Sequence, residues 1–257
     1  MSKAQQLQLN GIYKSYNNLP VLEDIHLQVF SGDIYTLIGK NGAGKTTLLE
    51  MLVGLTAPDQ GEIYYNQQQV QASSLHWKRN IGVALNMDHL IQTLTVEEYL
   101  HLLGSIYGLD QATAASRSKS LINFFYEPEE KIAKPIRSYS SGMKKKALIC
   151  AAFIHNPAIL LLDEPFTFLD PAACSRLCDF LSQQRQAGKI ILLSSHDLLY
   201  IDKIATRIGV LDNKQLILDS DYENFKQEND FFKDNKMLKK ILNYDSKNLT
   251  VLEEILK

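Results

Sequence analysis

The order of apolar and polar residues predicts strands in the first third of the chain. Apolar and polar positions alternate at residues 7–9 and 27–29, as they do in half-buried strands, and residues 34–38 form a further predicted strand. After a glycine-rich stretch, residues 46–55 carry apolar side chains at helical spacing, with Gly54 near the end as a stop signal. The sequence therefore predicts a strand, a glycine-rich loop and a helix in succession.

The middle of the chain, residues 86–156, has the pattern of several helices. Thr95 and Glu98 fit a capping box, and an apolar helical stretch follows them. Residues 121–126 and 142–155 are predicted to belong to two further helices.

The pattern returns to strands in the last third. Residues 159–162 and 190–193 are short, wholly apolar runs, which are typical of parallel strands covered on both faces. Residues 172–186 between them predict a helix, so the three segments form a βαβ unit. Residues 208–218 predict a hairpin, and the polar residues 221–257 predict a helical tail whose role the pattern does not indicate.

Composition limits the class of protein. A chain of 257 residues with 45% apolar residues can build one large α/β domain or two small ones. A net charge of −2 provides no basic field for binding nucleic acid. The first residues do not form the apolar core of a signal peptide, and no apolar run approaches the roughly 20 residues that span a bilayer. We therefore expect a soluble chain; if it works at a membrane, a partner must supply the membrane-spanning part.

The cysteines indicate a reducing cytoplasm. There are three of them, Cys150, Cys174 and Cys178, and an odd, sparse set does not suggest a disulfide framework. Cys174 and Cys178 could share a helical face, but no further Cys or His accompanies them as a metal site would require. We expect buried, unreactive thiols.

The glycine-rich loop has the spacing of a phosphate-binding loop. Gly39, Gly44, Lys45 and Thr46 fit the Walker A pattern G-x-x-x-x-G-K-[ST], between a strand and a helix. Glycines let backbone N–H groups turn toward phosphate oxygens, and the helix N-terminus adds donors of its own. The lysine brings a positive charge, and the threonine hydroxyl can bind Mg²⁺. A glycine-rich turn without a ligand is the alternative. The residues expected to contact the nucleotide are Gly39, Asn41, Gly42, Ala43, Gly44, Lys45, Thr46 and Thr47.

Two carboxylates follow the apolar run of residues 159–162. Asp163 lies at the carboxyl end of this predicted strand, which is the edge where open parallel sheets bind ligands. It is suited to bind Mg²⁺ together with Thr46, as a Walker B acid does. Glu164 comes next and could polarise an attacking water. A solvated acidic pair at a strand end is the alternative.

With these motifs in this order, residues 7–219 resemble the ATPase subunit of ATP-binding cassette (ABC) transporters. Ser140 and Gly142 lie where that family has its signature sequence, at the start of a helix. The resemblance implies that Tyr16 stacks on adenine, that Ser140 and Gly142 reach the γ-phosphate bound by a second subunit, and that Asp170 belongs to the D-loop. It also implies that His196, just after an apolar strand, contacts the γ-phosphate.

Three positions differ from the family pattern. Ser141 replaces the first glycine of the signature, and Phe168 lies where the D-loop region often has glycine. The glutamine expected between Walker A and the signature is replaced by Asn86, which we expect to sense the γ-phosphate together with His196. The lysines at residues 144–146 are interpreted as a solvated face rather than a binding patch.

The resemblance implies an α/β fold: a P-loop NTPase with a central, mainly parallel sheet, an N-terminal antiparallel β subdomain and a helical insertion subdomain. The core would comprise residues 1–86 and 157–220, the helical subdomain residues 87–156, and residues 221–257 a C-terminal helical tail.

The function implied is that of an ATPase that uses ATP and Mg²⁺, dimerises with a second ATPase subunit and powers an integral-membrane permease from the cytoplasmic face of the cell membrane. The Ser-Gly-Met-Lys form of the signature and residues 249–256 look most like bacterial exporter subunits. A soluble ABC ATPase without a permease, acting in assembly or repair, is the alternative. The presence of Glu164 and His196 argues against an inactive regulator.

Overall fold

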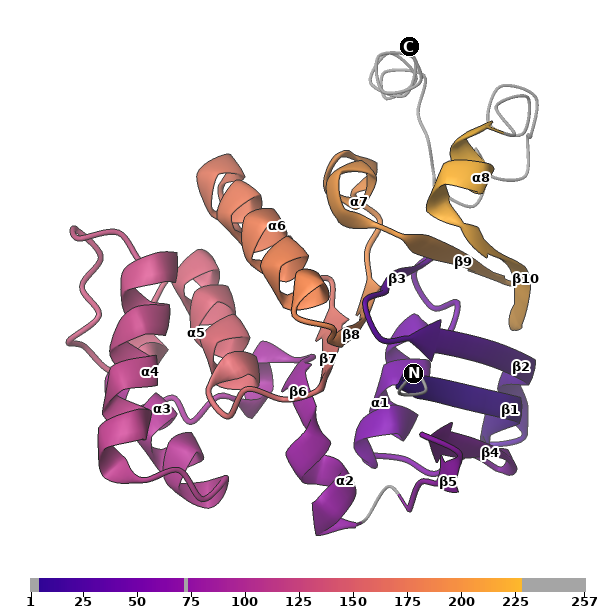
Figure 1. The fold of residues 1–257 in the computed structure, drawn as a ribbon, viewed down its shortest axis with the longest axis horizontal. Coiled ribbons are helices and arrows are strands. Elements are labelled where there is room, and N and C mark those ends of the chain that lie inside the picture. The colour runs from indigo at the N-terminus through magenta and orange to yellow at the C-terminus, as the bar shows by residue number, and fades with distance from the viewer. Residues whose placement is uncertain (1–4, 72–73, 228–257) are drawn as a thin grey trace.

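The computed structural model describes residues 5–71 and 74–227, which form two β-sheets and the helices that cover them (Figure 1). The smaller sheet is antiparallel, with strand order β2-β1-β4-β5. Its strands are β1 (Gln6–Tyr16), β2 (Leu19–Phe30), β4 (Gln60–Tyr65) and β5 (Gln68–Gln69). This sheet lies at one end of the molecule, next to helix α1.

The larger sheet has the strand order β10-β9-β3-β8-β7-β6. All neighbouring pairs in it are parallel except β9 and β10, which form the hairpin predicted near the end of the chain. The strands are β3 (Ile34–Gly39), β6 (Ile81–Ala84), β7 (Ile159–Asp163), β8 (Ile190–Ser194), β9 (Arg207–Asp212) and β10 (Gln215–Asp221). The carboxyl ends of β3, β7 and β8 meet at one edge, where the candidate site lies.

Five of the α-helices of the described residues fall into two groups. In Figure 1, α3, α4 and α5 gather at the end of the molecule opposite the antiparallel sheet, and α6 and α7 lie nearer the larger sheet. The α-helices are α1 (Lys45–Val53), α2 (Leu75–Asn80), α3 (Val96–Ile106), α4 (Gln111–Phe125), α5 (Ser141–Phe153), α6 (Pro171–Gln186), α7 (Leu198–Ile204) and α8 (Tyr222–Gln227), and the 3₁₀ helices are η1 (Met87–His89) and η2 (Ile136–Ser138). Among the described residues, none of these helices is long and apolar enough to cross a membrane.

The apolar run of β7 is buried on both faces because the two faces contact different cores. Leu160 and Leu162 belong to the core that contains α5 and α6. Ile159 and Leu161 belong to the core formed with α1 and the antiparallel sheet. Successive side chains of a strand point to opposite faces, so a central strand covered on both sides must be apolar at every position. This packing fixes the place at which Asp163 leaves the sheet.

The pattern-based predictions agree with these elements within a few residues. The predicted helix 46–55 is α1, and it ends at Gly54 in a left-handed conformation with φ 76°. Thr95 and Glu98 form the predicted capping box of α3. Of the predicted tail, α8 lies within the described residues, whereas residues 228–257, including 249–256, lie outside them. The division of the chain into a core, a helical subdomain and a tail stays a prediction.

The interpretation of residues 144–146 as a solvated face is wrong for two of the three lysines. Lys145 is 4% exposed and Lys146 is 3% exposed. Lys146 forms an ion pair of 2.7 Å with Glu130 and lies over the ring of Tyr126. Helix α5 is covered by other elements along most of its length, so these two lysines are buried as well. All three cysteines are buried free thiols, as predicted.

Candidate nucleotide site

The glycine-rich loop is held in shape by close backbone packing. It leaves the buried strand β3 at Gly39, where an added Cβ would overlap the carbonyl oxygen of Leu211 on the neighbouring strand. Gly42 and Gly44 have φ values of 81° and 102°, a conformation that side-chain-bearing residues rarely adopt. Gly44 is also the N-cap of α1. The sequence therefore folds here into a loop whose backbone opens toward the N-terminus of a helix, a geometry suited to phosphate.

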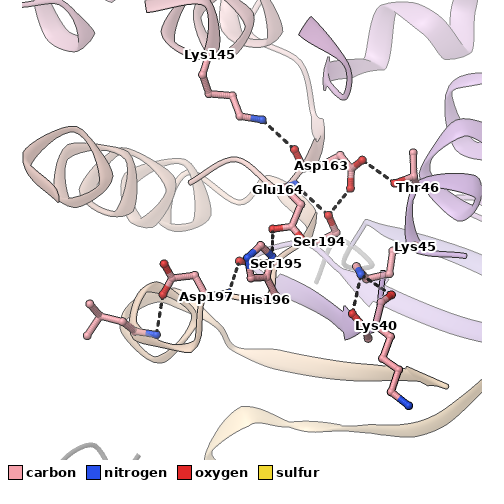
Figure 2. Close-up of polar contacts among 12 residues, drawn as sticks. Lys40, Lys45, Thr46, Lys145, Asp163, Glu164, Ser194, Ser195, His196 and Asp197 are labelled. Carbon is pink, nitrogen blue, oxygen red and sulfur yellow. Dashed lines mark hydrogen bonds and ion pairs between the residues drawn. The ribbon is translucent and has the colours of Figure 1, made fainter. Parts of the chain in front are cut away.

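Lys45 places its ammonium group inside this loop. Its Nζ donates to the carbonyl oxygen of Gly39 at 2.7 Å and to that of Lys40 at 3.1 Å (Figure 2). The residue is 7% exposed, and burial lowers the pKa of Lys45, an effect that the carboxylates of Glu164 and Asp163 oppose. The loop thus holds a positive charge beside its own backbone donors.

Asp163 meets Thr46 at the end of β7. The Thr46 hydroxyl donates to Oδ2 of Asp163 at 2.7 Å, and the Ser194 hydroxyl donates to Oδ1 (Figure 2). Ser194 ends β8, the strand next to β7, so the sheet register sets this contact. A hydroxyl and a carboxylate this close are the hard oxygen ligands that Mg²⁺ prefers. The donor set therefore fits the metal predicted from the sequence.

Glu164 leaves the sheet in a different direction from Asp163. Its φ of 45° ends the strand, and its backbone N–H donates to the carbonyl and hydroxyl oxygens of Ser194 at 3.2 and 3.0 Å. Its Oε2 lies 2.9 Å from Nδ1 of His196. The carboxylate and the imidazole, both predicted as site residues, are therefore in direct contact.

Two cavities share the residues at this edge of the sheet. The smaller, of about 190 Å³, is lined by the loop and by the two carboxylates: Val21, Asn41, Gly42, Gly44, Lys45, Thr46, Thr47, Asp163 and Glu164. The larger, of about 320 Å³, is lined by Thr46, Glu50, Leu85, Asn86, Met87, His89, Lys145, Asp163, Glu164, Thr167 and Phe168. Both have Thr46, Asp163 and Glu164 in their walls, so these three residues border both spaces.

Asn86 lies on the larger cavity, just after β6. Its side-chain oxygen accepts from the N–H of Asp88 at 2.9 Å and caps the short helix η1. The cavity therefore brings Asn86 and Glu164 to one space. The role of Asn86 in sensing phosphate stays a prediction.

A comparison with protein-family models matches residues 22–167 to the family described as ABC transporter, which is more than half of the chain. The chain belongs to the ABC transporter family. The family predicted from the sequence motifs, that of the ABC ATPase subunits, is thereby confirmed.

Two curated relatives illustrate where the chain lies within the ABC family. It is 33% identical over 211 residues to the Nod factor export ATP-binding protein I of Ralstonia nicotianae, covering 82% of this chain and 65% of that protein. It is 30% identical over 211 residues to the linearmycin resistance ATP-binding protein LnrL of Bacillus subtilis, covering 82% of this chain and 68% of that protein. The chain thus spans less than two thirds of the Ralstonia protein.

Solved structures confirm the predicted α/β fold class. An ATP-binding subunit of an ABC transporter superposes with a TM-score of 0.79 at 30% identity, over 86% of this chain and 92% of that one. A dimeric ATP-binding cassette in a post-hydrolysis state, bound to ADP and Pi, superposes with a TM-score of 0.76 at 21% identity, over 84% and 98%. At that identity, the second comparison supports the fold alone.

The residues predicted to form the ABC signature do not line the cavity at the glycine-rich loop of the same chain. Ser140 is the N-cap of α5, and its hydroxyl accepts from the N–H of Met143 at 3.2 Å. At Gly142, an added Cβ would come within 2.8 Å of the carbonyl oxygen of Phe168. Neither Ser140 nor Gly142 lines the cavity of the phosphate loop. The structure of one chain therefore does not bring these two residues to the nucleotide site, and their contact with a second subunit stays a prediction.

The predicted residues that line neither cavity also include Gly39, Ala43, His196, Tyr16 and Asp170. Tyr16 ends β1, is 43% exposed and has the ammonium of Lys14 5.2 Å from its ring centre. Asp170 caps α6, accepting from the N–H of Ala173 at 2.8 Å, and this hydrogen bond holds the pKa of Asp170 below its usual range.

Two residues that contact Asp163 were not predicted from the sequence. Ser194 orients Asp163, and Lys145 donates to the backbone oxygen of Asp163 at 3.1 Å. Ser194 directly follows the apolar run of residues 190–193, so its position at the end of a predicted strand could have indicated a site residue. Lys145 precedes an almost uninterrupted apolar stretch in α5, which indicates a helix buried on all sides.

Proposed function

We propose that this chain binds MgATP, hydrolyses it as part of a dimer and powers a separate membrane permease. The observation that carries the proposal is that the Walker A segment and the carboxylate at the end of β7 are in direct contact. The phosphate loop reaches the end of β7 through the bond between Thr46 and Asp163, directly beside the Glu164–His196 pair.

In this mechanism the residues of the chain mainly orient the nucleotide and the attacking water and neutralise the charge of the phosphates. The loop N–H groups and the Lys45 ammonium would hold the phosphates, while Thr46 and Asp163 would hold Mg²⁺. When bound, the metal neutralises charge on the phosphates. Glu164 accepts a hydrogen bond from the attacking water and draws its proton away. His196, held by Glu164 in this structure, donates to the γ-phosphate. The rate enhancement comes from orientation and electrostatic stabilisation.

The transport role is supported by what the relatives are called. Both curated relatives described above are named as ATP-binding proteins, one for export of Nod factor and one for linearmycin resistance. We infer that this chain serves an exporter, working on the cytoplasmic face of the cell membrane through a permease and beside a second ATPase subunit, identical or related.

Glu164→Gln is the sharpest test of the proposed chemistry. The amide keeps the size of the side chain but cannot take a proton, so turnover should fall by about a hundredfold or more while MgATP still binds. Steady-state phosphate release and calorimetry measure the two effects. Glu97→Gln makes the same change on the exposed side of α3 and should leave the rate unaltered.

The same variant tests the dimer. With ATP it cannot complete a cycle, so light scattering should show a dimer that ADP does not produce. A variant that turns over at the parent rate would remove Glu164 from the proposed role. A monomer with ATP bound would contradict a homodimer and leave pairing with a related subunit. Faster ATP turnover on reconstitution with a co-purified membrane protein would support the permease.

A further inference from the structure

Lys145 is a buried charged residue that the proposed mechanism does not use. It lies on α5, five positions after the N-cap Ser140, and its side chain extends toward the carboxyl end of β7 (Figure 2). Its Nζ donates to the carbonyl oxygen of Asp163 at 3.1 Å, and the residue is 4% exposed. Helix α5 therefore contacts the backbone of β7 at its last residue, Asp163, directly before Glu164.

No ion pair accounts for this burial. Among the described residues, Lys145 has no carboxylate oxygen within ion-pair distance, whereas its neighbour Lys146 has Glu130 at 2.7 Å. Burial lowers the pKa of Lys145, and the more distant charges of Asp163 and Glu164 only oppose this effect. A buried ammonium is costly, and an apolar side chain of similar size is often as stable or more so. Packing alone therefore gives little reason for a lysine at this position.

The position of the contact suggests what the lysine does. The carbonyl of Asp163 and the N–H of Glu164 belong to one peptide group, which is planar. Lys145 binds its oxygen, and Ser194 accepts from its N–H. Hydrogen bonds therefore hold this peptide plane at both its carbonyl oxygen and its N–H, directly before Glu164 turns away from the strand with a φ of 45°. Holding this plane sets the direction in which the Glu164 side chain leaves the strand.

The contact between Lys145 and Asp163 also lies at the wall of the larger cavity. Lys145 and Glu164 both line the cavity of about 320 Å³, together with Asn86. An ammonium has three donors, and one of them binds Asp163. The helix that carries Lys145 begins at Ser140, about 7.5 Å away along the helix axis.

We propose that Lys145 is a positioning residue for ATP hydrolysis, which fixes the Asp163–Glu164 peptide and thereby joins the signature helix to the carboxylate that acts on water. The proposal rests on the function proposed above. It assigns Lys145 to the catalytic step and not to nucleotide affinity, because Lys145 does not line the cavity of the phosphate loop.

The test compares Lys145→Met with Lys145→Arg. Methionine fills a similar volume without a donor, whereas arginine keeps a charged donor on the same helix position. In Lys145→Met, kcat for ATP should fall tenfold or more while KM and the affinity for MgADP stay within twofold of the parent. Lys145→Arg should recover a third or more of the parent kcat. Lys119→Met removes a lysine from the exposed surface of α4 and should leave all three quantities unaltered.

The outcomes below decide whether Lys145 positions the Asp163–Glu164 peptide. A parent-like kcat in Lys145→Met would overturn the proposal. So would a joint loss of kcat, MgADP affinity and thermal stability that arginine does not restore, because that pattern indicates a structural role. The parent and Glu164→Gln are assayed alongside. If the parent does not hydrolyse ATP, the proposed function fails and this proposal fails with it. If only Glu164→Gln and not Lys145→Met loses turnover, the function stands without Lys145.

Discussion

Replacing Lys45 with methionine tests how the loop binds phosphate. The side chain keeps its length and loses its charge. In the structure the Lys45 Nζ already makes hydrogen bonds of 2.7 and 3.1 Å to the carbonyl oxygens of Gly39 and Lys40. When ATP binds, the ammonium forms hydrogen bonds to charged phosphate oxygens, and its bonds to the two carbonyl oxygens weaken or break. The gain in affinity is therefore smaller than the sum of the new bonds.

The expected loss of affinity follows from this exchange. A hydrogen bond to a charged group contributes about 1.5–3 kcal/mol. With two such bonds formed and two carbonyl bonds weakened, the net contribution is about 2 kcal/mol, or about a thirtyfold increase in Kd. Without nucleotide, the methionine variant should unfold at a temperature no lower than the parent, because Lys45 is only 7% exposed and the variant no longer buries an ammonium there.

Calorimetry with MgATP in the Glu164→Gln background gives the Kd without consuming the nucleotide. Lys78→Met, on the exposed surface of α2, provides the matched control and should bind as tightly as the parent. A Kd for Lys45→Met within twofold of the control would refute the reasoning and reduce the loop to a structural turn.

Two further predictions concern Asn86 and His155. Asn86 is shorter than glutamine by about 1.5 Å, one carbon–carbon bond, so Asn86→Gln should raise basal ATPase several-fold and Asn86→Ala should lower permease-stimulated turnover. Parent-like rates in both variants, with and without the permease, would remove Asn86 from phosphate sensing. Burial lowers the pKa of His155 to about 4 from 6.5. Between these values the unfolded chain takes up a proton that the folded chain does not, so the free energy of unfolding falls as pH drops through this window, by up to about 3 kcal/mol. Urea unfolding at about pH 7 and about pH 4.5 should show a smaller fall for His155→Gln than for the parent, and equal falls would contradict this assignment.

The sequence was sufficient where chemistry depends on neighbouring residues along the chain. Gly39, Gly44, Lys45 and Thr46 act within one loop, so their spacing alone indicated a phosphate site. The apolar run before Asp163 likewise indicated a strand end at the ligand-binding edge.

The sequence was insufficient where a contact depends on packing between distant elements. Lys145 was predicted to be solvated because charged side chains usually are. It is buried because other helices and strands surround α5. The bond from Ser194 to Asp163 needs β7 and β8 to be neighbours in one register, which a pattern of apolar residues does not specify. The predicted contact of Ser140 with a second subunit would form only in an assembly, so one chain, in sequence or in structure, leaves it as a prediction.

The two-sided burial of β7 determines how insertions and deletions near the site would act. Removing one residue from the loop before Ile159 would either strain that loop or draw the strand back by one position. In the second case Asp163 would enter the place of Leu162, opposite Leu193, and every apolar side chain of the strand would change faces. Glu164 would then occupy the place of Asp163, beside Thr46 and Ser194. A single lost codon far from the phosphate loop would therefore put Glu164 in the place of Asp163 and bury Asp163 in the place of Leu162, while leaving both carboxylates in the sequence.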